Sequence, residues 1–226
     1  MKNNTKMVKR FMNFYKLLNK FKKPAFSIGI ILFIIILFNR FLLADVIYES
    51  DDYKHHAVRT ASYYLAVKQK ALPVRWGPNL NQGYGYPSFN HMYHAPYISG
   101  AFLHAVGFSI QESLNFTVLL SLLLGAVGCY FFVKSYFKTK PLSELWSILL
   151  SLFFILNPYT LLNVYWRGAA GELIFYALVP FFLLFVKKLL IKTNYFYVLL
   201  TSIASSLLII SHLPSMLLLA PVAITF

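Results

Sequence analysis

Long uncharged apolar runs are the feature that most limits what this chain of 226 residues can fold into. Hydrophobic residues make up 58% of the sequence and charged residues only 12%, which is about half the charged share of an ordinary soluble domain. The uncharged residues are concentrated in apolar runs long enough to cross a bilayer, for which a helix needs roughly 20 apolar residues. The pattern predicts an all-α integral membrane protein, a polytopic helical bundle, and excludes one large soluble core.

The apolar runs predict six membrane spans and one large loop between the first two. The last run has no polar flank where the sequence stops, so we expect that span to be incomplete and a C-terminal remainder to be missing. The expected spans cover residues 25–44, 116–133, 143–160, 172–190, 195–211 and 213–226, and the loop covers residues 45–115.

The positions of lysine and arginine predict how the chain is oriented. Eight of the 21 basic residues lie in the first 23 positions, and no acid accompanies them. If the short apolar segment 96–109 does not span, 14 basic residues lie on the side of the N-terminus and six on the other side; if it does span, the numbers become nine and eleven. Because cytoplasmic loops carry the basic excess, we expect the first arrangement, with the N-terminus cytoplasmic, the loop 45–115 extracytoplasmic and segment 96–109 an interfacial helix.

The basic N-terminal tail, residues 1–24, predicts a membrane-surface segment. Phe11, Phe14, Leu18 and Phe21 recur at helical spacing between lysines, which is typical of an amphipathic helix bound to anionic lipid. A net charge of +14 would suggest nucleic acid in a soluble protein. Here the basic excess lies beside membrane segments, so the expected partner is the lipid bilayer and not nucleic acid.

The residues best suited to chemistry follow the first span. If residues 49–63 are helical, Asp52, His56, Arg59 and Tyr63 share one face. An acid, an imidazole and a guanidinium together can transfer a proton and bind phosphate. The competing interpretation is a solvated helix with local ion pairs. The doubled pairs Asp51-Asp52 and His55-His56 leave the register of the motif open.

The rest of the outer loop adds aromatic and imidazole groups. Glycine and proline at high density predict an irregular loop over residues 73–87. Its Trp76 suits either sugar stacking or a membrane interface. His91 and His94 alone are weak evidence for a metal site, because no third ligand is evident. A divalent metal therefore stays open as a cofactor, and no metal ligand is assigned.

Two later outer segments bring further polar groups to the same side of the membrane. Arg167 and Glu172 lie at the mouths of two spans, where ionisable residues are either functional or paired to hold span ends together. His212 follows the fifth predicted span. Common nucleotide-binding, metalloprotease and serine-hydrolase motifs are absent from the sequence.

The order of these segments resembles the polytopic glycosyltransferases of the GT-C superfamily, and within it the bacterial 6-pyruvoyl-tetrahydropterin synthase-related membrane proteins. The resemblance covers about residues 26–220. Its motifs are Asp-x-x-x-His-x-x-Arg at Asp52, a loop motif around Trp76, Arg-Gly-x-x-x-Glu at Arg167, and His-Leu-Pro at His212. The family label carries no implication of pterin chemistry.

This resemblance implies a GT-C-like fold and a sugar donor carried on polyprenyl phosphate. It implies that Asp52, with Asp51 as the fallback, is the general base or the acid that orients the acceptor. It also implies a substrate-binding set, in which the cations and imidazoles contact phosphate: His55, His56, Arg59, Trp76, His91, His94, Arg167, Glu172 and His212.

The sequence therefore predicts a cell-membrane glycosyltransferase that acts on an extracytoplasmic cell-envelope glycan or glycolipid. One alternative is a non-catalytic membrane protein that binds or assembles lipid-linked glycans. A flippase or transporter is disfavoured, because spans two to five lack charged residues in their interiors.

Overall fold

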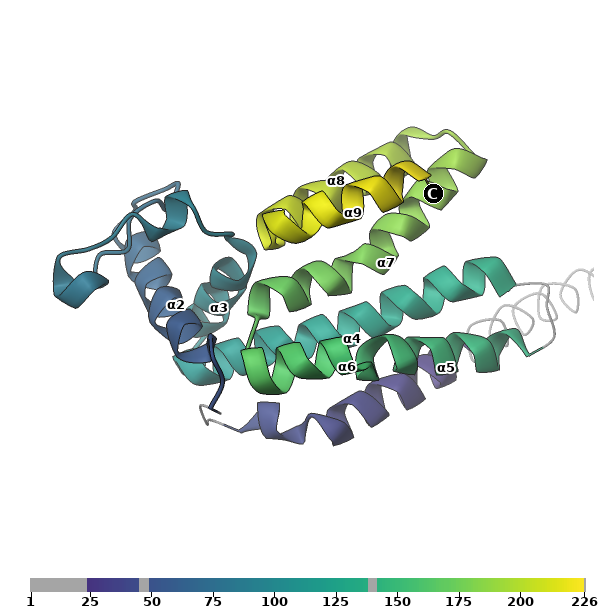
Figure 1. Cartoon of the computed structure of the whole chain (residues 1–226), viewed down its shortest axis with the longest axis horizontal. Helices are drawn as coiled ribbons and strands as arrows, with labels where there is room; N and C mark the ends of the chain where they lie inside the picture. The colour runs from purple at the N-terminus through teal and green to yellow at the C-terminus, as the bar shows by residue number, and fades with distance from the viewer. Residues whose placement is uncertain (1–23, 45–48, 138–141, 226) are drawn as a thin grey trace, which may run out of the picture.

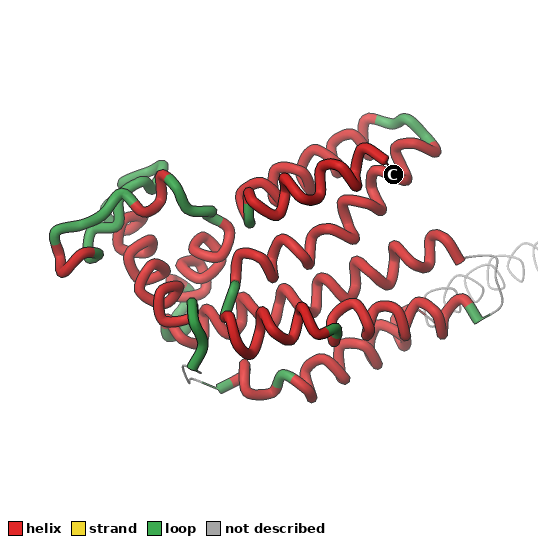
Figure 2. The backbone as a smooth tube through the Cα atoms, viewed as in Figure 1, coloured by secondary structure: helices red, strands yellow, loops and turns green. Residues whose placement is uncertain are grey.

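The computed structural model describes residues 24–44, 49–137 and 142–225. The amphipathic helix expected over residues 1–24 lies almost wholly outside these residues. Within them, helices account for all the regular structure, and the one β-type pairing is an isolated bridge between Gly77 and Tyr86 (Figures 1 and 2). The predicted all-α class is therefore confirmed for the described part of the chain.

In the described part of the chain, eleven helical elements carry the fold, and two further 3₁₀ turns, η2 (Asn81–Gly83) and η3 (Ser88–Asn90), lie in the loop before α3. The described residues begin with the helix Pro24–Phe38 and continue through η1 (Arg40–Leu43), α2 (Tyr53–Lys68), α3 (Ala95–Ala105), α4 (Ile110–Phe137), α5 (Ser143–Leu156), α6 (Pro158–Leu161), the π-helical turn η4 (Leu162–Arg167), α7 (Ala170–Ile191), α8 (Tyr195–Ser211) and α9 (Leu213–Thr225).

Within the residues that the structure describes, two helices, α4 and α7, are long and apolar enough to cross a membrane, and α5 with the segment Pro158–Arg167 is a third candidate if the two count as one span. Pro24–Phe38, α8 and α9 are apolar but shorter. The third candidate is bent by 40° where α5 ends. Asn157 there is extended, and Pro158, which has no N–H, begins the next helical turn.

Small residues allow α4 and α7 to pack closely along their length. A Cβ atom on Gly125 would lie 3.1 Å from the Cα atom of Ala177, and one on Gly128 would overlap the ring of Phe181. Close approach through small residues is the usual way in which membrane helices associate. The core beside this contact is apolar and includes Leu122 of α4.

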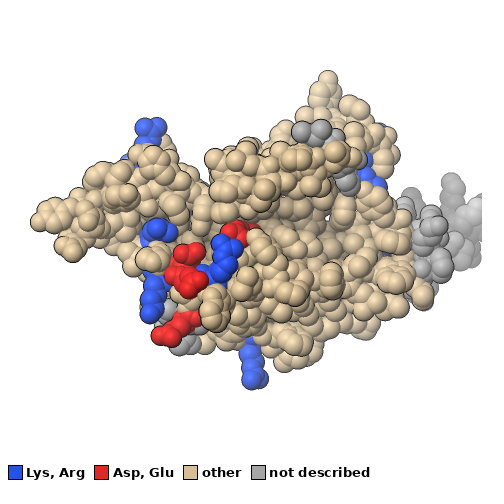
Figure 3. Space-filling model, viewed as in Figure 1, with Lys and Arg blue, Asp and Glu red and all other residues tan. Residues whose placement is uncertain are grey.

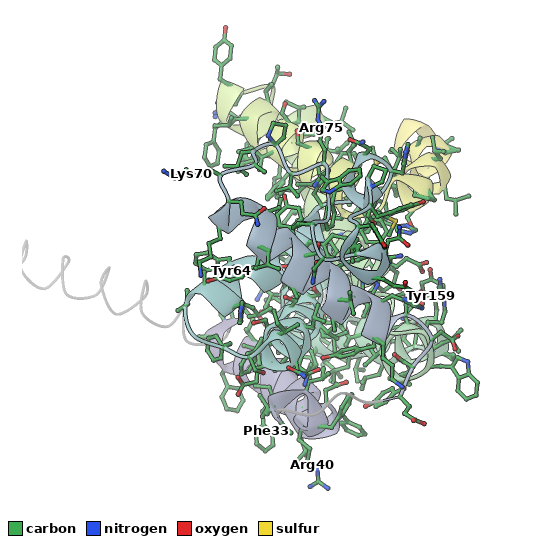
Figure 4. The ribbon with its side chains drawn as sticks, turned by 90° about the vertical axis from the view of Figure 1, so that its left-hand side faces the viewer. Phe33, Arg40, Tyr64, Lys70, Arg75 and Tyr159 are labelled. Atoms are coloured by element: carbon green, nitrogen blue, oxygen red, sulfur yellow. The ribbon has the colours of Figure 1, made fainter. Side chains whose placement is uncertain are left out.

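Residues 49–109 form a packed helical cap at one end of the bundle (Figures 1 and 4). Its interior joins Tyr63 of α2, Phe89 and Tyr97 in one apolar cluster. The helix expected within residues 96–109 is present as α3, with Tyr97 buried and Phe102 exposed. In Figure 4, which looks onto this end, Arg75 lies on the cap loop and Arg40 lies at the far edge of the bundle.

The two ends of the bundle differ in the polar residues that they carry. The helix Pro24–Phe38 begins, and α4 and α7 finish, at the end opposite the cap (Figure 1). The basic residues in the last turns of these two helices, Lys134 of α4 and Lys188 of α7, therefore lie far from the cap. The residues proposed from sequence as functional, by contrast, belong to the cap and to the helix ends beside it.

Candidate functional site

Three segments that are distant in sequence meet where the cap joins the bundle: the start of α2, the turn between η4 and α7, and the junction of α8 with α9. Two backbone hydrogen bonds connect the first pair, from Asp51 N–H to Trp166 C=O at 3.1 Å and from Asp52 N–H to Arg167 C=O at 2.9 Å. A third connects His94 N–H to the carbonyl of Ile210 at 2.9 Å. In Figure 3 acidic and basic side chains gather at this junction, whereas most of the bundle face is uncharged.

Two glycines before and within the first turn of α7 allow this approach. Gly168 has a φ of +66°, and a Cβ atom there would overlap Ser50 Oγ and lie 3.1 Å from the backbone nitrogen of Tyr53. A Cβ atom on Gly171 would overlap the ring of Tyr93. Because neither position tolerates a side chain, the Arg-Gly-x-x-Gly-Glu spacing fixes the cap against α7.

Arg167 and Glu172 form a bidentate ion pair at this junction. Arg167 Nη1 and Nη2 donate to Glu172 Oε2 and Oε1 at 2.8 and 2.7 Å, and Nη1 also donates to Asn163 Oδ1 at 2.8 Å. Tyr159 O–H donates to Glu172 Oε2 at 2.6 Å. His212 Nε2 lies 3.9 Å from Glu172 Oε1. Glu172 is therefore committed to holding η4, α7 and the α8–α9 junction together.

His56 is buried in the cap beside a column of aromatic rings. Its Nδ1 lies 3.1 Å from the hydroxyl of Tyr97, and its Nε2 is buried with no hydrogen-bond partner among the described residues. Tyr97 stacks on Tyr93 with 6.0 Å between ring centroids, and Tyr93 contacts His212 at 5.1 Å. The column thus connects α2 with the start of α9.

Burial determines the protonation of these groups. Burial, with the nearby Arg59 guanidinium as a second cause, lowers the pKa of His56 to about 4, so the imidazole is neutral at neutral pH. Burial raises the pKa of Tyr97 to about 12, and of Tyr93 still further. Burial also lowers the pKa of His212. The imidazoles of His56 and His212 are therefore neutral hydrogen-bonding groups and not standing cations.

The two candidate acids differ in their surroundings. Asp51 is exposed, whereas Asp52 is half-buried at the N-cap of α2, where its side chain makes no capping hydrogen bond. Arg59 is half-buried one turn beyond His56 and lies close to the Tyr97 side chain. Among the described residues neither Asp52 nor Arg59 forms an ion pair. A carboxylate and a guanidinium therefore remain available to a ligand here.

Not every residue proposed from sequence joins the cluster. Trp76 lies out on the cap loop, half exposed, where its ring covers Gly85. His55 and His91 are exposed. His94 packs edge-on against Tyr63. Within the part of the chain that the structure describes, no three His, Cys, Asp or Glu side chains are grouped to hold a metal ion.

Four members of the cluster were missed from sequence: Tyr93, Tyr97, Tyr159 and Asn163. Helical spacing signals the last two, because Tyr159 and Asn163 are four residues apart and Arg167 follows after four more. This series reaches Glu172 from a single side of α6 and η4. Tyr93 lies before α3 begins, so its contact with Tyr97 has no such signal.

Comparison with known proteins gives a family for this arrangement. A protein-family model described as "6-pyruvoyl-tetrahydropterin synthase related domain; membrane protein" matches residues 91–226. The chain belongs to this family. No curated protein and no solved structure matches it. The family region contains Tyr93, Arg167, Glu172 and His212, whereas Asp52, His56 and Arg59 precede it.

The family assignment confirms the narrower half of the sequence resemblance, namely the 6-pyruvoyl-tetrahydropterin synthase-related membrane proteins. It also agrees with the apolar helices of the bundle, of which two or three are candidate spans. Membrane association of the chain is thereby supported from two independent directions.

Proposed function

We propose that this protein is a membrane glycosyltransferase that moves a sugar from a polyprenyl-phosphate donor to an extracytoplasmic acceptor. The observation that carries the proposal is the half-buried carboxylate of Asp52 where the apolar helices end, which forms no ion pair among the described residues. This carboxylate lies within electrostatic reach of Arg167 and is on the same helix face as Arg59. A donor anchored in the bilayer presents its phosphate at this level. A carboxylate and guanidinium groups at one end of the bundle are the groups that such a reaction needs.

The transfer assigns a separate role to each charged group. An acceptor hydroxyl attacks the anomeric carbon of the sugar and gives its proton to Asp52. The bond between that carbon and the phosphate oxygen breaks, and the electron pair leaves with polyprenyl phosphate. Arg59 binds the phosphate as its charge increases, because a guanidinium matches phosphate geometry. Arg167, already paired with Glu172, positions Asp52 through the backbone contact at 2.9 Å.

The opposite end of the bundle supports the proposed orientation. Lys134 and Lys188 lie in the last turns of α4 and α7, as expected for helix ends that face the cytoplasm. The acid, imidazole and arginine groups belong to the other end. An extracytoplasmic cap follows if the basic end faces the cytoplasm.

The test compares the two neighbouring acids in the full-length protein reconstituted into liposomes. Donor probes are monosaccharides on polyprenyl phosphate, the acceptor source is a membrane lipid extract, and release of polyprenyl phosphate is measured. We expect Asp52→Asn to reduce transfer by at least a hundredfold, within the range for loss of an acid–base group. The exposed Asp51→Asn is the matched control and should retain transfer. Full transfer by Asp52→Asn would falsify the proposal.

The second candidate is a non-catalytic protein that binds or assembles lipid-linked glycans. The closed pairing of Arg167 with Glu172 favours it, since that pair stabilises the junction without needing a reaction. Under this alternative the reconstituted wild type binds the donor probes but releases no polyprenyl phosphate from any of them.

A further inference from the structure

One face of α7 lines two neighbouring cavities. A cavity of about 260 Å³ lies between α7 and α9, and one of about 320 Å³ lies where α7 faces α4 and α5. Tyr176 and Val179 line both cavities, so the two adjoin along this face of α7, and together we call them the α7 groove. The α7 residues of the groove recur every three or four positions, as one helix face requires: Glu172, Phe175, Tyr176, Val179, Pro180 and Leu183.

This α7 groove changes from polar to apolar along its length. Tyr159 and Glu172 of the junction lie at the end beside the cap, with Ser215 of α9 next to them. Beyond Tyr176, farther from the cap, the walls of the groove are almost wholly apolar and include Phe132, Leu150 and Leu183. From Glu172 to Leu183 the groove follows α7 over eleven residue-to-residue steps, roughly 16 Å of helix. In Figure 3 the molecular face is hollowed between the upper and lower helices.

The polar groups inside the groove are already satisfied. The amide of Asn157 donates to the hydroxyls of Thr160 and Tyr176 at 3.0 and 3.2 Å. The Tyr176 ring stacks on Phe154, with 4.2 Å between centroids and only 5° between planes. Among the described residues, the part of the groove far from the cap therefore has no uncommitted polar group for a ligand to bind, so a hydrocarbon occupant fits it best.

We propose that the α7 groove holds the hydrocarbon tail of the polyprenyl-phosphate donor. This inference rests on the proposed function and adds where its lipid lies. The single apolar track with one polar end fits an amphiphile that has one chain, whereas a bilayer phospholipid carries two chains on one head. A tail in the groove brings its phosphate to the end formed by Glu172 and Tyr159. There Glu172 is neutralised by Arg167, and Asp52 and Arg59 lie across the same junction.

The experiment measures binding of tritiated farnesyl monophosphate to the full-length protein in phosphatidylcholine nanodiscs. Val179→Trp fills the point that both cavities share, and should weaken binding at least tenfold. Val198→Trp is the matched control, because Val198 is exposed on α8 and lines neither cavity. We expect this variant to bind the probe as the wild type does.

A second variant distinguishes a blocked groove from a misfolded protein. Leu183→Trp fills only the far end, so it should weaken farnesyl phosphate at least tenfold while leaving the shorter geranyl phosphate unaffected. A misfolded protein would lose both probes, and equal loss of both contradicts the proposed placement of the tail. Unchanged farnesyl phosphate binding by Val179→Trp also overturns it.

Competitors identify the source of the bound chain. Excess dioleoyl phosphatidate or inorganic phosphate should leave the probe bound. Equal displacement by dioleoyl phosphatidate would assign the groove to bilayer lipid, and displacement by inorganic phosphate would assign binding to the head group alone.

The Asp52→Asn variant distinguishes failure of the tail site from failure of the proposed function. If this variant transfers sugar normally while Val179→Trp loses the probe, the proposed function fails and the tail site stands. If Asp52→Asn abolishes transfer while Val179→Trp binds the probe normally, the proposed function stands and the proposed tail site fails.

Discussion

Lys134 and Glu144 connect α4 with α5 at one end of the bundle, whereas Arg167 and Glu172 connect η4 with α7 at the other. At the first end Tyr130 O–H donates to Glu144 at 2.7 Å, and Ser27 of the first helix donates at 3.1 Å. Three helices are thus held by one carboxylate. The second carboxylate, Glu172, is surrounded in the same way. At both ends an acid–cation ion pair holds helices together, and we call each such pair a brace.

The two ends differ in the charges that remain. At the basic end Lys187 donates to the carbonyl and hydroxyl of Ser135 at 3.0 Å, and the charges left without an ion pair among the described residues, Lys188 and Lys192, are cations only. At the cap end Asp52 and Arg59 stay without an ion pair among the described residues. A brace alone needs no such neighbours. We infer that the cap end combines a brace with a ligand site, and that the basic end has only the brace.

The test with the largest expected effect removes one cation from each end, in two separate variants. Arg59→Ala should reduce sugar transfer by about a hundred- to a thousandfold, which is typical for loss of a group that stabilises developing negative charge. Lys187→Ala, at the basic end, should leave transfer unchanged. Initial rates of polyprenyl phosphate release from the reconstituted protein check both. Similar losses in the two variants would remove the distinction between the ends.

The next test uses the buried imidazole of the cap. Burial holds the pKa of His56 at about 4, against 6.5 when unfolded. Between these two pH values the unfolded chain binds more protons than the folded protein. The contribution of His56 to stability is therefore fully present above pH 6.5 and is lost as the pH falls toward 4. We expect protonation of this imidazole to lower the free energy of unfolding of the cap by about 3 kcal/mol at pH 4. Thermal unfolding of the wild type and of His56→Gln, followed from pH 7 to pH 4, should give the steeper loss in the wild type. Parallel profiles would show that His56 makes no such contribution.

Only the local part of this site can be predicted from sequence. A helix period places Asp52, His56 and Arg59 on one face, and α2 runs from Tyr53 through all the later members of that face. The shortage of charge likewise predicts the helical membrane class, because burying a charge in lipid is costly. Both arguments use only neighbours in the chain or overall composition.

The long-range part of the site has no comparable signal. The hydrogen bond from Asp52 to Arg167 joins residues 115 positions apart, and the column from His56 through Tyr93 to His212 crosses three separate segments. Spacing says nothing about such contacts. The bend after Asn157 was also not foreseen, although Pro158 is a local signal for it.

The two braces should also differ in their contribution to stability. The Glu172 side chain is 12% exposed and that of Glu144 35%. Removing one partner of a buried pair leaves the other charge uncompensated, whereas exposed pairs contribute little. We expect Glu172→Gln to lower the free energy of unfolding by about 2 kcal/mol and Glu144→Gln by about 1 kcal/mol or less. Unfolding in mixed micelles by increasing sodium dodecyl sulfate measures both, and the reverse order would contradict this ranking.

The smallest expected effect concerns how the cap is seated on α7. Gly168→Ala forces a side chain into a left-handed conformation and against Ser50 and Tyr53, so it should cost about 1–2 kcal/mol. Gly29→Ala is the matched control, because a Cβ atom there meets nothing within 4 Å and alanine favours a helix. The same detergent titration should show the first variant less stable than the wild type and the second at least as stable. Sugar transfer should fall with Gly168→Ala as well, since Gly168 follows the residue whose carbonyl accepts from Asp52. If Gly168→Ala loses stability yet transfers sugar normally, the cap can shift on α7 without disturbing Asp52, and the contact between them is a brace alone.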